Sequence, residues 1–324
     1  MPGGTTRTAR ETVSFEAIGT RWTLSTRDPL AADALAEVHR TIDEYDRAFS
    51  RFRPDSTLVA ASRAAGTFAL PPVADELFDT YRRLDLLTEG AVSPLVGASL
   101  VHLGYDAGYG LRPLPGYLPA PRWQDLCDWD GERLTTSAPV LIDVGAVGKG
   151  QLVDLVADVL REAGAHEATV DAGGDVRHLA GTRGSTGSHG GAEVHGGAEV
   201  PEATGLRVGL EHPGHADGRT VLGVVEIGDG AVCGSAPNRR SWGTGLHHVL
   251  DARTGVPTSG VAATWGVAPT AMLADAAATA LFFVGPRDLG ALAPGQEITG
   301  VVVLDDGRAV WSEQLPGEIF TEGS

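Results

Sequence analysis

The sequence predicts an α+β fold from two kinds of periodicity. In several segments apolar residues recur at steps of three and four, which is the spacing of an amphipathic helix. Other segments are short apolar or alternating runs bounded by Gly and Pro, a pattern typical of strands. The chain has 324 residues, of which 42% are apolar and 21% are charged. That composition is typical of a globular protein, and the length suits one large domain or about two.

The first half is expected to contain a strand and two helices. Phe15–Thr26 alternates like a strand that is interrupted by a turn at Gly19. A helix follows it, with an apolar face made of Leu35, Val38, Ile42, Tyr45 and Phe49. A second helix is predicted from about residue 72 to residue 87. Residues 104–121 are rich in Gly, Pro and Tyr and are expected to form a loop.

The second half is expected to begin with a short strand, Val140–Val144, that enters a glycine-rich turn at 145–150. A third helix leaves this turn and ends at Gly164. Residues 182–204 contain HGGAEV twice in tandem, which predicts a disordered low-complexity insertion. The last third is expected to hold one helix, at about 271–283, among strands at 206–210, 221–227, 246–250, 261–268, 300–304 and 308–311.

Charge and composition exclude several classes of protein. The 25 Lys and Arg residues against 42 Asp and Glu give a formal net charge of −17. This argues against a chain that mainly grips nucleic acid or anionic lipid, because such binding needs cations to neutralise phosphates. The two cysteines, Cys127 and Cys233, rule out a disulfide framework. No signal peptide, lipid anchor or membrane span is readable, so a soluble cytoplasmic protein is expected; a missing N-terminus would make it extracytoplasmic.

The segment LIDVGAVGKG (141–150) predicts an anion site. A strand that feeds a glycine turn and a helix N-terminus points free N–H groups at a ligand, and Lys149 adds a full charge. Asp154 lies one turn further into the helix. The segment is neither a Walker A loop nor a GxGxxG dinucleotide motif. A structural tight turn with an exposed Lys explains the same letters.

A second glycine pair occurs in VDAGGDVR (170–177), after a predicted strand. Two adjacent glycines permit a ligand to approach the backbone closely, and Asp175 is placed to hold a hydroxyl or an amine. A hairpin turn explains this pattern about as well.

Asp275 and Thr279 are four residues apart on a predicted helix of small apolar residues, ADAAATA (274–280). Their oxygens therefore lie on one face of that helix. A carboxylate in such surroundings is costly unless it is paired or bound to a metal, and hard oxygen ligands suit Mg²⁺. The alternative is a helix-terminal Asp with a Thr that bonds back to the helix.

The segment LHHVLDARTG (246–255) combines a His, a carboxylate and a basic residue before a glycine turn. Such a set can supply a general base and a phosphate contact. Adjacent histidines are also common as surface or core residues, and that reading stays open.

Taken together and in order, these motifs resemble the ApbE-type flavin transferases, the FAD:protein FMN transferases. The similar segments run from about Phe15 to Gly285. They comprise IGT (18–20), FSRFRPDS (49–56), GAVSPLVG (90–97), the glycine turn with Asp154, AGGDVR (172–177), HHVLDARTG (247–255) and ADAAATA (274–280).

The resemblance implies a magnesium-dependent enzyme that binds FAD, cleaves its pyrophosphate and transfers FMN to a Thr or Ser hydroxyl of a target protein, releasing AMP. It implies a bilobal α+β domain over residues 13–314, with a mixed β-sheet and a ligand cleft between the lobes. Residues 1–12 are then a disordered N-terminus and residues 315–324 a C-terminal tail. The acceptor is expected to be an electron-transfer flavoprotein.

The resemblance also implies roles for individual residues. Mg²⁺ is expected at Asp275, Thr279 and the backbone carbonyl of Gly148. His248 and Asp251 are expected near the reacting phosphoryl group, with His248 as the proton acceptor. The flavin nucleotide is expected to contact Gly19, Thr20, Gly145, Lys149, Asp154, Gly174, Asp175 and Ser235.

The chain departs from the family pattern at Ile18 in place of Met, Gly148 in place of Ala, Ala252 in place of Pro, and GSA (234–236) in place of Thr-Ser-Gly. These changes bear on pocket detail. Two other functions stay open. Water in place of the acceptor hydroxyl would make the protein an FAD pyrophosphatase. A non-catalytic flavin-binding protein is the other alternative, against which the joint presence of Asp275, Thr279 and His248 argues.

Overall fold

The computed structural model describes residues 10–181, 205–214 and 220–320, and these form an α+β structure as predicted. The helices are α1 (Ala32–Phe49), α2 (Thr57–Arg63), α3 (Ala74–Leu87), α4 (Gly97–His102), α5 (Trp123–Leu126), α6 (Gly148–Glu162) and α7 (Ala271–Ala280), with 3₁₀ turns η1 (Pro94–Val96), η2 (Pro237–Arg240) and η3 (Pro286–Ala291). Among these residues no helix is both long enough and apolar enough to cross a membrane.

Eight strands form the central sheet, in the order β1-β2-β6-β7-β10-β15-β16-β17. Their bounds are β1 Glu11–Ala17, β2 Thr20–Thr26, β6 Ala168–Ala172, β7 Asp175–Leu179, β10 Gly230–Ser235, β15 Val261–Ala268, β16 Thr299–Leu304 and β17 Ala309–Trp311. Each neighbouring pair is antiparallel. The prediction of a mixed sheet is therefore wrong, because tight turns join β1 to β2 and β6 to β7, and such turns pair strands antiparallel.

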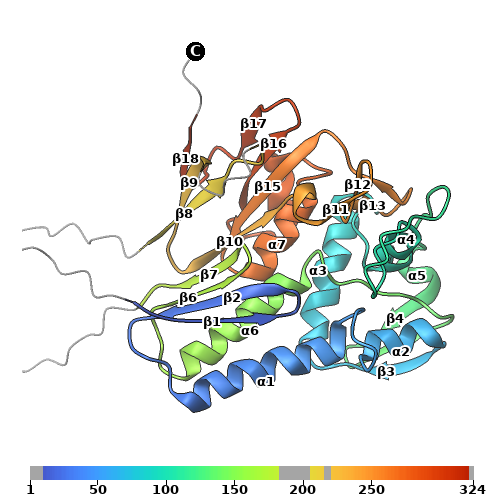
Figure 1. Ribbon diagram of the computed structural model, residues 1–324, viewed down its shortest axis with the longest axis horizontal. Helices are drawn as coiled ribbons and strands as arrows, with labels where there is room; N and C mark the ends of the chain where they lie inside the picture. Colours follow the sequence, from blue (N-terminus) through green and yellow to red (C-terminus); the bar gives the residue numbers. More distant parts are fainter. Residues whose placement is uncertain (1–9, 182–204, 215–219, 321–324) are drawn as a thin grey trace, which may run out of the picture.

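The helices α6 and α7, which line the candidate site, cover one face of the central sheet (Figure 1). The neighbouring helices α6 and α7 pack on this face, α6 on β6 and β7 and α7 on β10 and β15; α1 contacts α6 and α3 contacts α7. The helix α7 lies unusually close to its neighbours. A methyl group on Gly150 of α6 would collide with the carbonyl of Ala271, and one on Gly266 of β15 with that of Ala274. Glycine at both positions is what lets the backbones approach.

The other face of the central sheet is covered by a three-stranded sheet in the order β18-β9-β8. An aliphatic cluster that includes Val176, Val232 and Val301 of the central sheet fills the space between the two sheets. The bounds of the remaining strands are β3 Gly66–Ala69, β4 Cys127–Trp129, β5 Arg133–Thr136, β8 Leu206–Glu211, β9 Val221–Ile227, β11 Ser241–Trp242, β12 Leu246–His247, β13 Leu250–Asp251, β14 Val256–Pro257 and β18 Gly317–Ile319. Thus β18 lies within the segment that was expected to be a tail.

Several predicted elements differ from the structure. Val140–Val144 is not a strand, because its backbone donors bond to helical segments and not to a neighbouring strand: Val140 N to Ala61 O of α2 (3.0 Å) and Asp143 N to Pro94 O of η1 (2.8 Å). The strand expected at 246–250 is divided into β12 and β13, and the last helix ends at Ala280. The predicted turn at Gly19 is confirmed. The insertion at 182–204 and residues 1–9 of the predicted disordered N-terminus lie outside the described residues.

Candidate active site

A cavity of about 900 Å³ lies between the helices α6 and α7 and segments from the first third of the chain. Many of the residues predicted for the site line it together, although they are far apart in the sequence. These are Gly19, Thr20, Gly145, Gly148, Lys149, Ser235, His248, Asp275 and Thr279. The predicted residues Asp154, Gly174, Asp175 and Asp251 do not line it.

One end of the cavity concentrates buried charge. The Lys149 ammonium, at the start of α6, pairs with the fully buried carboxylate of Asp175 on β7. Asp275, on α7, accepts a hydrogen bond from the backbone N–H of Gly150 (3.0 Å). Burial and the nearby Asp175 charge raise the pKa of Asp275 well above its ordinary value. Burial opposes the charge of Lys149, but Asp175 and Asp275 outweigh it and raise the pKa of the ammonium. Two carboxylates thus lie near one ammonium, and the raised pKa of each shows that a second negative charge is disfavoured there.

The oxygen atoms at this end fit a hard divalent cation. The Thr279 hydroxyl lies 3.4 Å from the carbonyl oxygen of Ala146, one helical turn beyond Asp275. A carboxylate, a hydroxyl and a carbonyl are ligands of the kind that Mg²⁺ takes alongside water and phosphate. In the described parts of the chain no three His, Cys, Asp or Glu side chains are grouped for a metal, so the fit rests on this mixed set. The Ala146 carbonyl was not among the predicted ligands, and the role of Gly148 stays a prediction.

His248 lies just after β12 and lines the cavity. Its Nδ1 is buried and has no partner among the described residues. Burial, and then the positive charge of Arg240, lower the pKa of His248 to about 4, although a hydrogen bond with the Arg240 backbone opposes this. The ring is therefore neutral at pH 7, with a nitrogen free to accept a proton. The neighbouring His247 serves the fold, since its Nε2 bonds with the Thr258 carbonyl (2.9 Å).

Asp251 forms part of a turn beside the cavity. Its carboxylate forms an ion pair with the Arg253 guanidinium (Oδ2 to Nη2, 2.7 Å), and its backbone carbonyl accepts a hydrogen bond from the Gly255 N–H (2.7 Å). The hydrogen bonds to Arg253 hold the pKa of Asp251 below its usual value. The structure therefore does not bring Asp251 into the cavity lining with His248.

Asp154 caps the helix that carries Asp275 and Thr279. Its two oxygens accept hydrogen bonds from the backbone N–H groups of Ala271 and Met272, both at 2.8 Å. Burial raises the pKa of Asp154 to about 6, against these hydrogen bonds. Its place between α6 and α7 fixes the start of α7, the arrangement of an N-cap supplied by another helix.

Gly174 belongs to the turn between β6 and β7, where its φ of +104° and its N–H bond to Asp171 Oδ1 (3.0 Å) are those of a hairpin. The hairpin reading of this motif is therefore confirmed. The turn still bears on the site, because Gly173 lines the cavity and approaches the Thr20 side chain too closely to allow a Cβ atom.

The other end of the cavity is aromatic, and most of it was missed in the sequence. The rings of Phe52 and Tyr109 stack at 5.6 Å between centroids, and those of Tyr105 and Trp242 at 5.4 Å. All four line the cavity. They come from three separate segments, since only Tyr105 and Tyr109 share a loop, so no spacing rule could have joined them all.

Comparison with known proteins identifies chains that are similar to this one. The model of the ApbE family matches residues 18–302. A protein named "FAD:protein FMN transferase" from Vibrio cholerae is 27% identical over 289 residues, which cover 84% of this chain and 80% of that one. A protein of the same name from Rhodobacter capsulatus is 26% identical over 291 residues. These residues cover 86% of this chain but only 51% of that relative, so this chain spans about half of its length.

Solved structures show the same fold. The flavin transferase ApbE from Vibrio cholerae superposes with a TM-score of 0.72 at 24% identity, over 94% of this chain and 97% of that one. The ApbE protein from Thermotoga maritima superposes with a TM-score of 0.73 at 22% identity, over 94% and 97%.

Proposed function

This chain belongs to the ApbE family, and on that premise we propose that it transfers FMN from FAD to a Thr or Ser hydroxyl of an acceptor protein and releases AMP. The observation that carries the proposal is the cavity itself. It brings a cation, hard oxygen ligands and a neutral imidazole to one place, from three separate parts of the sequence.

The charged end suits the FAD pyrophosphate. Lys149 lies at the N-terminus of α6, a helix of fifteen residues whose dipole favours an anion there. Arg240 lines the same cavity and adds a second cation. A phosphate approaching Lys149 also meets the buried carboxyl groups of Asp175 and Asp275, so phosphate binding and divalent-cation binding are expected to depend on each other.

Asp275, Thr279 and a carbonyl of the 146–148 turn would hold Mg²⁺. When bound, this ion would neutralise charge on the pyrophosphate and polarise the phosphorus. Asp275 accepts the Gly150 N–H and so keeps its carboxylate facing the turn. The raised pKa of Asp275 reflects the cost of a buried charge, which a bound cation removes.

The transfer needs a base for the acceptor hydroxyl, which is a weak nucleophile. The hydroxyl oxygen attacks the phosphorus of the FMN half, the phosphoanhydride bond to the AMP half breaks, and AMP leaves with the bond's electron pair. His248 Nδ1 receives the hydroxyl proton. Its pKa of about 4 keeps this nitrogen unprotonated at neutral pH, and it is the ring nitrogen left without a partner among the described residues.

The test is to incubate the purified protein with FAD and Mg²⁺, with and without a flavodoxin-like or electron-transfer protein that exposes a Thr. AMP release that requires the acceptor, together with one FMN added to the acceptor by mass, is the expected result. AMP and free FMN without acceptor would show the pyrophosphatase instead. FAD binding with no AMP in either reaction would show a binding protein and refute the transfer.

A further inference from the structure

Arg51 is a buried cation in the cavity wall that the proposed chemistry does not use. It follows the C-terminus of α1, and its side chain is only 2% exposed. Its Nε donates to the Asp143 carboxylate and its Nη1 to the Tyr105 carbonyl oxygen (3.0 Å). The third nitrogen, Nη2, is buried and has no partner in the part of the chain that the structure describes. A guanidinium cannot lose its proton in a protein, so this donor needs an acceptor from elsewhere.

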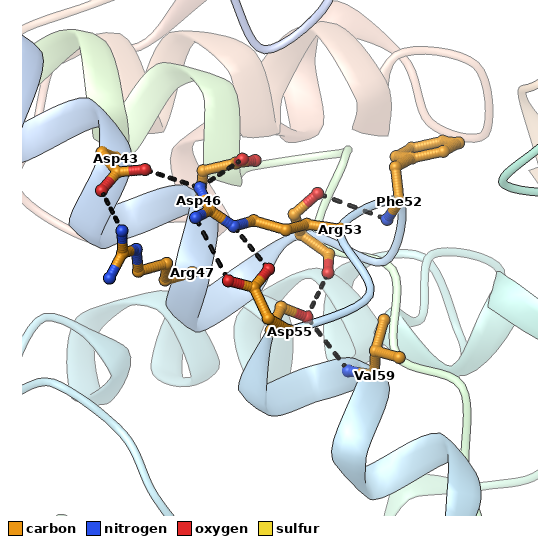
Figure 2. Close-up of polar contacts among 9 residues, drawn as sticks. Asp43, Asp46, Arg47, Phe52, Arg53, Asp55 and Val59 are labelled. Atoms are coloured by element: carbon orange, nitrogen blue, oxygen red, sulfur yellow. Dashed lines mark hydrogen bonds and ion pairs between the residues drawn. The ribbon is translucent and has the colours of Figure 1, made fainter.

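Arg53, two residues later, shows what a satisfied arginine looks like in the same segment (Figure 2). Its Nε and Nη2 bind Asp55 at 2.7 and 3.2 Å, and its Nη1 binds Asp43 at 2.6 Å and Asp46 at 3.4 Å. All three nitrogens of Arg53 are therefore taken by carboxylates. The free Nη2 of Arg51 is a property of that residue and not of the segment.

The surroundings of Arg51 favour a flat aromatic ligand over a phosphate. The guanidinium carbon lies 4.1 Å from the centre of the Phe52 ring and 4.8 Å from that of Tyr105. Both rings line the cavity, with Tyr109 and Trp242 beside them. Aromatic faces of this kind stack on planar ring systems and solvate anions poorly.

The charge of Arg51 points the same way. Asp143 already neutralises the guanidinium, and its other oxygen is occupied by the Gly145 N–H (2.7 Å). A neutral ion pair with one spare N–H suits an uncharged acceptor such as a ring carbonyl. Lys149, at the N-terminus of α6, remains for the phosphates.

We propose that Arg51 is a specificity-determining residue that donates its Nη2 hydrogen bond to a carbonyl oxygen of the isoalloxazine ring of FAD. This rests on the proposed function, because it takes FAD as the ligand. It places the flavin ring at the aromatic end of the cavity and the pyrophosphate at the Lys149 end.

The test measures the dissociation constants of FAD, FMN and ADP by calorimetry, in Mg²⁺, for the wild-type protein, Arg51→Lys and the control Arg40→Lys, whose exposed guanidinium on α1 is held by Glu37 and Glu44 outside the cavity lining. Lysine keeps the charge, but its ammonium lacks the fork of a guanidinium and cannot donate to Asp143, to the Tyr105 carbonyl and to the ligand at the same time. Arg51→Lys should bind FAD and FMN about tenfold to a hundredfold more weakly and ADP equally well, as loss of a charged hydrogen bond predicts. Arg40→Lys should change none of the three.

Several results would overturn the assignment. Equal weakening of ADP and FMN would place the contact on a phosphate or show general damage to the site, and unchanged FAD affinity would remove the contact. Wild-type protein that neither binds FAD nor releases AMP would refute the proposed function as well.

A second measurement uses only wild-type protein, in case Arg51→Lys fails to fold. Flavins with sulfur in place of the C2 or the C4 oxygen accept hydrogen bonds poorly. One of the two should bind several-fold more weakly than FMN, and equal binding of all three would overturn the contact.

Discussion

The two ends of the cavity are built in different ways. The charged end stands on α6, α7 and β7, and its carboxyl groups are buried: Asp275 is 6% exposed and Asp175 fully buried. The aromatic end stands on loops and short segments; Tyr105 and Trp242 are buried there, but Tyr109 is 55% exposed with a φ of +52°. Rigid elements thus hold the groups proposed for chemistry, while the loop at 104–121 presents rings to the ligand. This division predicts that damage to the charged end stops the reaction, whereas damage to the aromatic end weakens binding.

The most severe test of this division is Asp275→Ala. We expect Mg²⁺-dependent AMP release to fall about a thousandfold, since metal assistance is worth several kcal/mol. The variant should stay folded, because loss of the acceptor for the Gly150 N–H is offset by removal of a carboxylate whose charge is disfavoured in the folded state. Asp306→Ala, at an exposed position, is the control for the assay. Full activity in Asp275→Ala would eliminate the proposed metal site.

The buried pair at the charged end is tested by Lys149→Met. Losing one partner of a buried ion pair should lower the free energy of unfolding by about 3 kcal/mol, because Asp175 is fully buried. Chemical denaturation measures this. Adding Asp175→Asn should restore most of the stability without restoring FAD affinity. If the single and double variants are equally unstable, the pair is not what holds this end together.

The pH dependence of the reaction tests His248. With a pKa of about 4, the ring stays neutral from pH 8 to about pH 5, so kcat/KM for AMP release should be flat there and fall only near pH 4. Because this pKa is depressed, the contribution of His248 to stability is complete above the unfolded value of about 6.5. That contribution declines as the pH falls from there toward 4. A rate profile with its inflection near pH 6.5 would contradict a buried ring.

Tyr109→Ala tests the aromatic end and should have the smallest effect. Loss of one stacked ring is worth about 0.5–1.5 kcal/mol, so the dissociation constant of FAD should rise about threefold to tenfold. At saturating FAD the rate should stay close to that of the wild type. A large fall in kcat with unchanged FAD affinity would mean that the aromatic end contributes to the chemical step and not only to binding.

Features that depend on contacts between residues close in the sequence were predicted correctly, and features that depend on distant contacts were not. The periodicity of Leu35 to Phe49 predicted α1 correctly, because i, i+3 and i+4 contacts are local. The strand β10 was missed because Gly, Ala and Cys dominate it and lack the strand preference of β-branched residues. Arg51 and Asp143 pair across 92 residues, a contact that no spacing rule reveals.

The acidic residues show a second limit. Asp154 and Asp175 lie beside glycine turns, where a carboxylate that faces a ligand and one that faces the interior look alike in sequence. In the structure Asp154 holds the backbone of α7 and Asp175 holds Lys149. Only the packing of α6 against α7 and β7 distinguishes the two uses.

The close packing of α7 has a consequence for how this protein can evolve. Six of its ten residues are Ala, and Gly150 and Gly266 press against its backbone. A larger side chain on almost any side would shift Asp275 and Thr279, so the helix has little room for mutational drift. The loop at 104–121 carries exposed Tyr109, Leu111, Leu114 and Tyr117 and has no such restraint. Variation in what the enzyme recognises is therefore expected to accumulate in that loop, and a library aimed at new specificity belongs there.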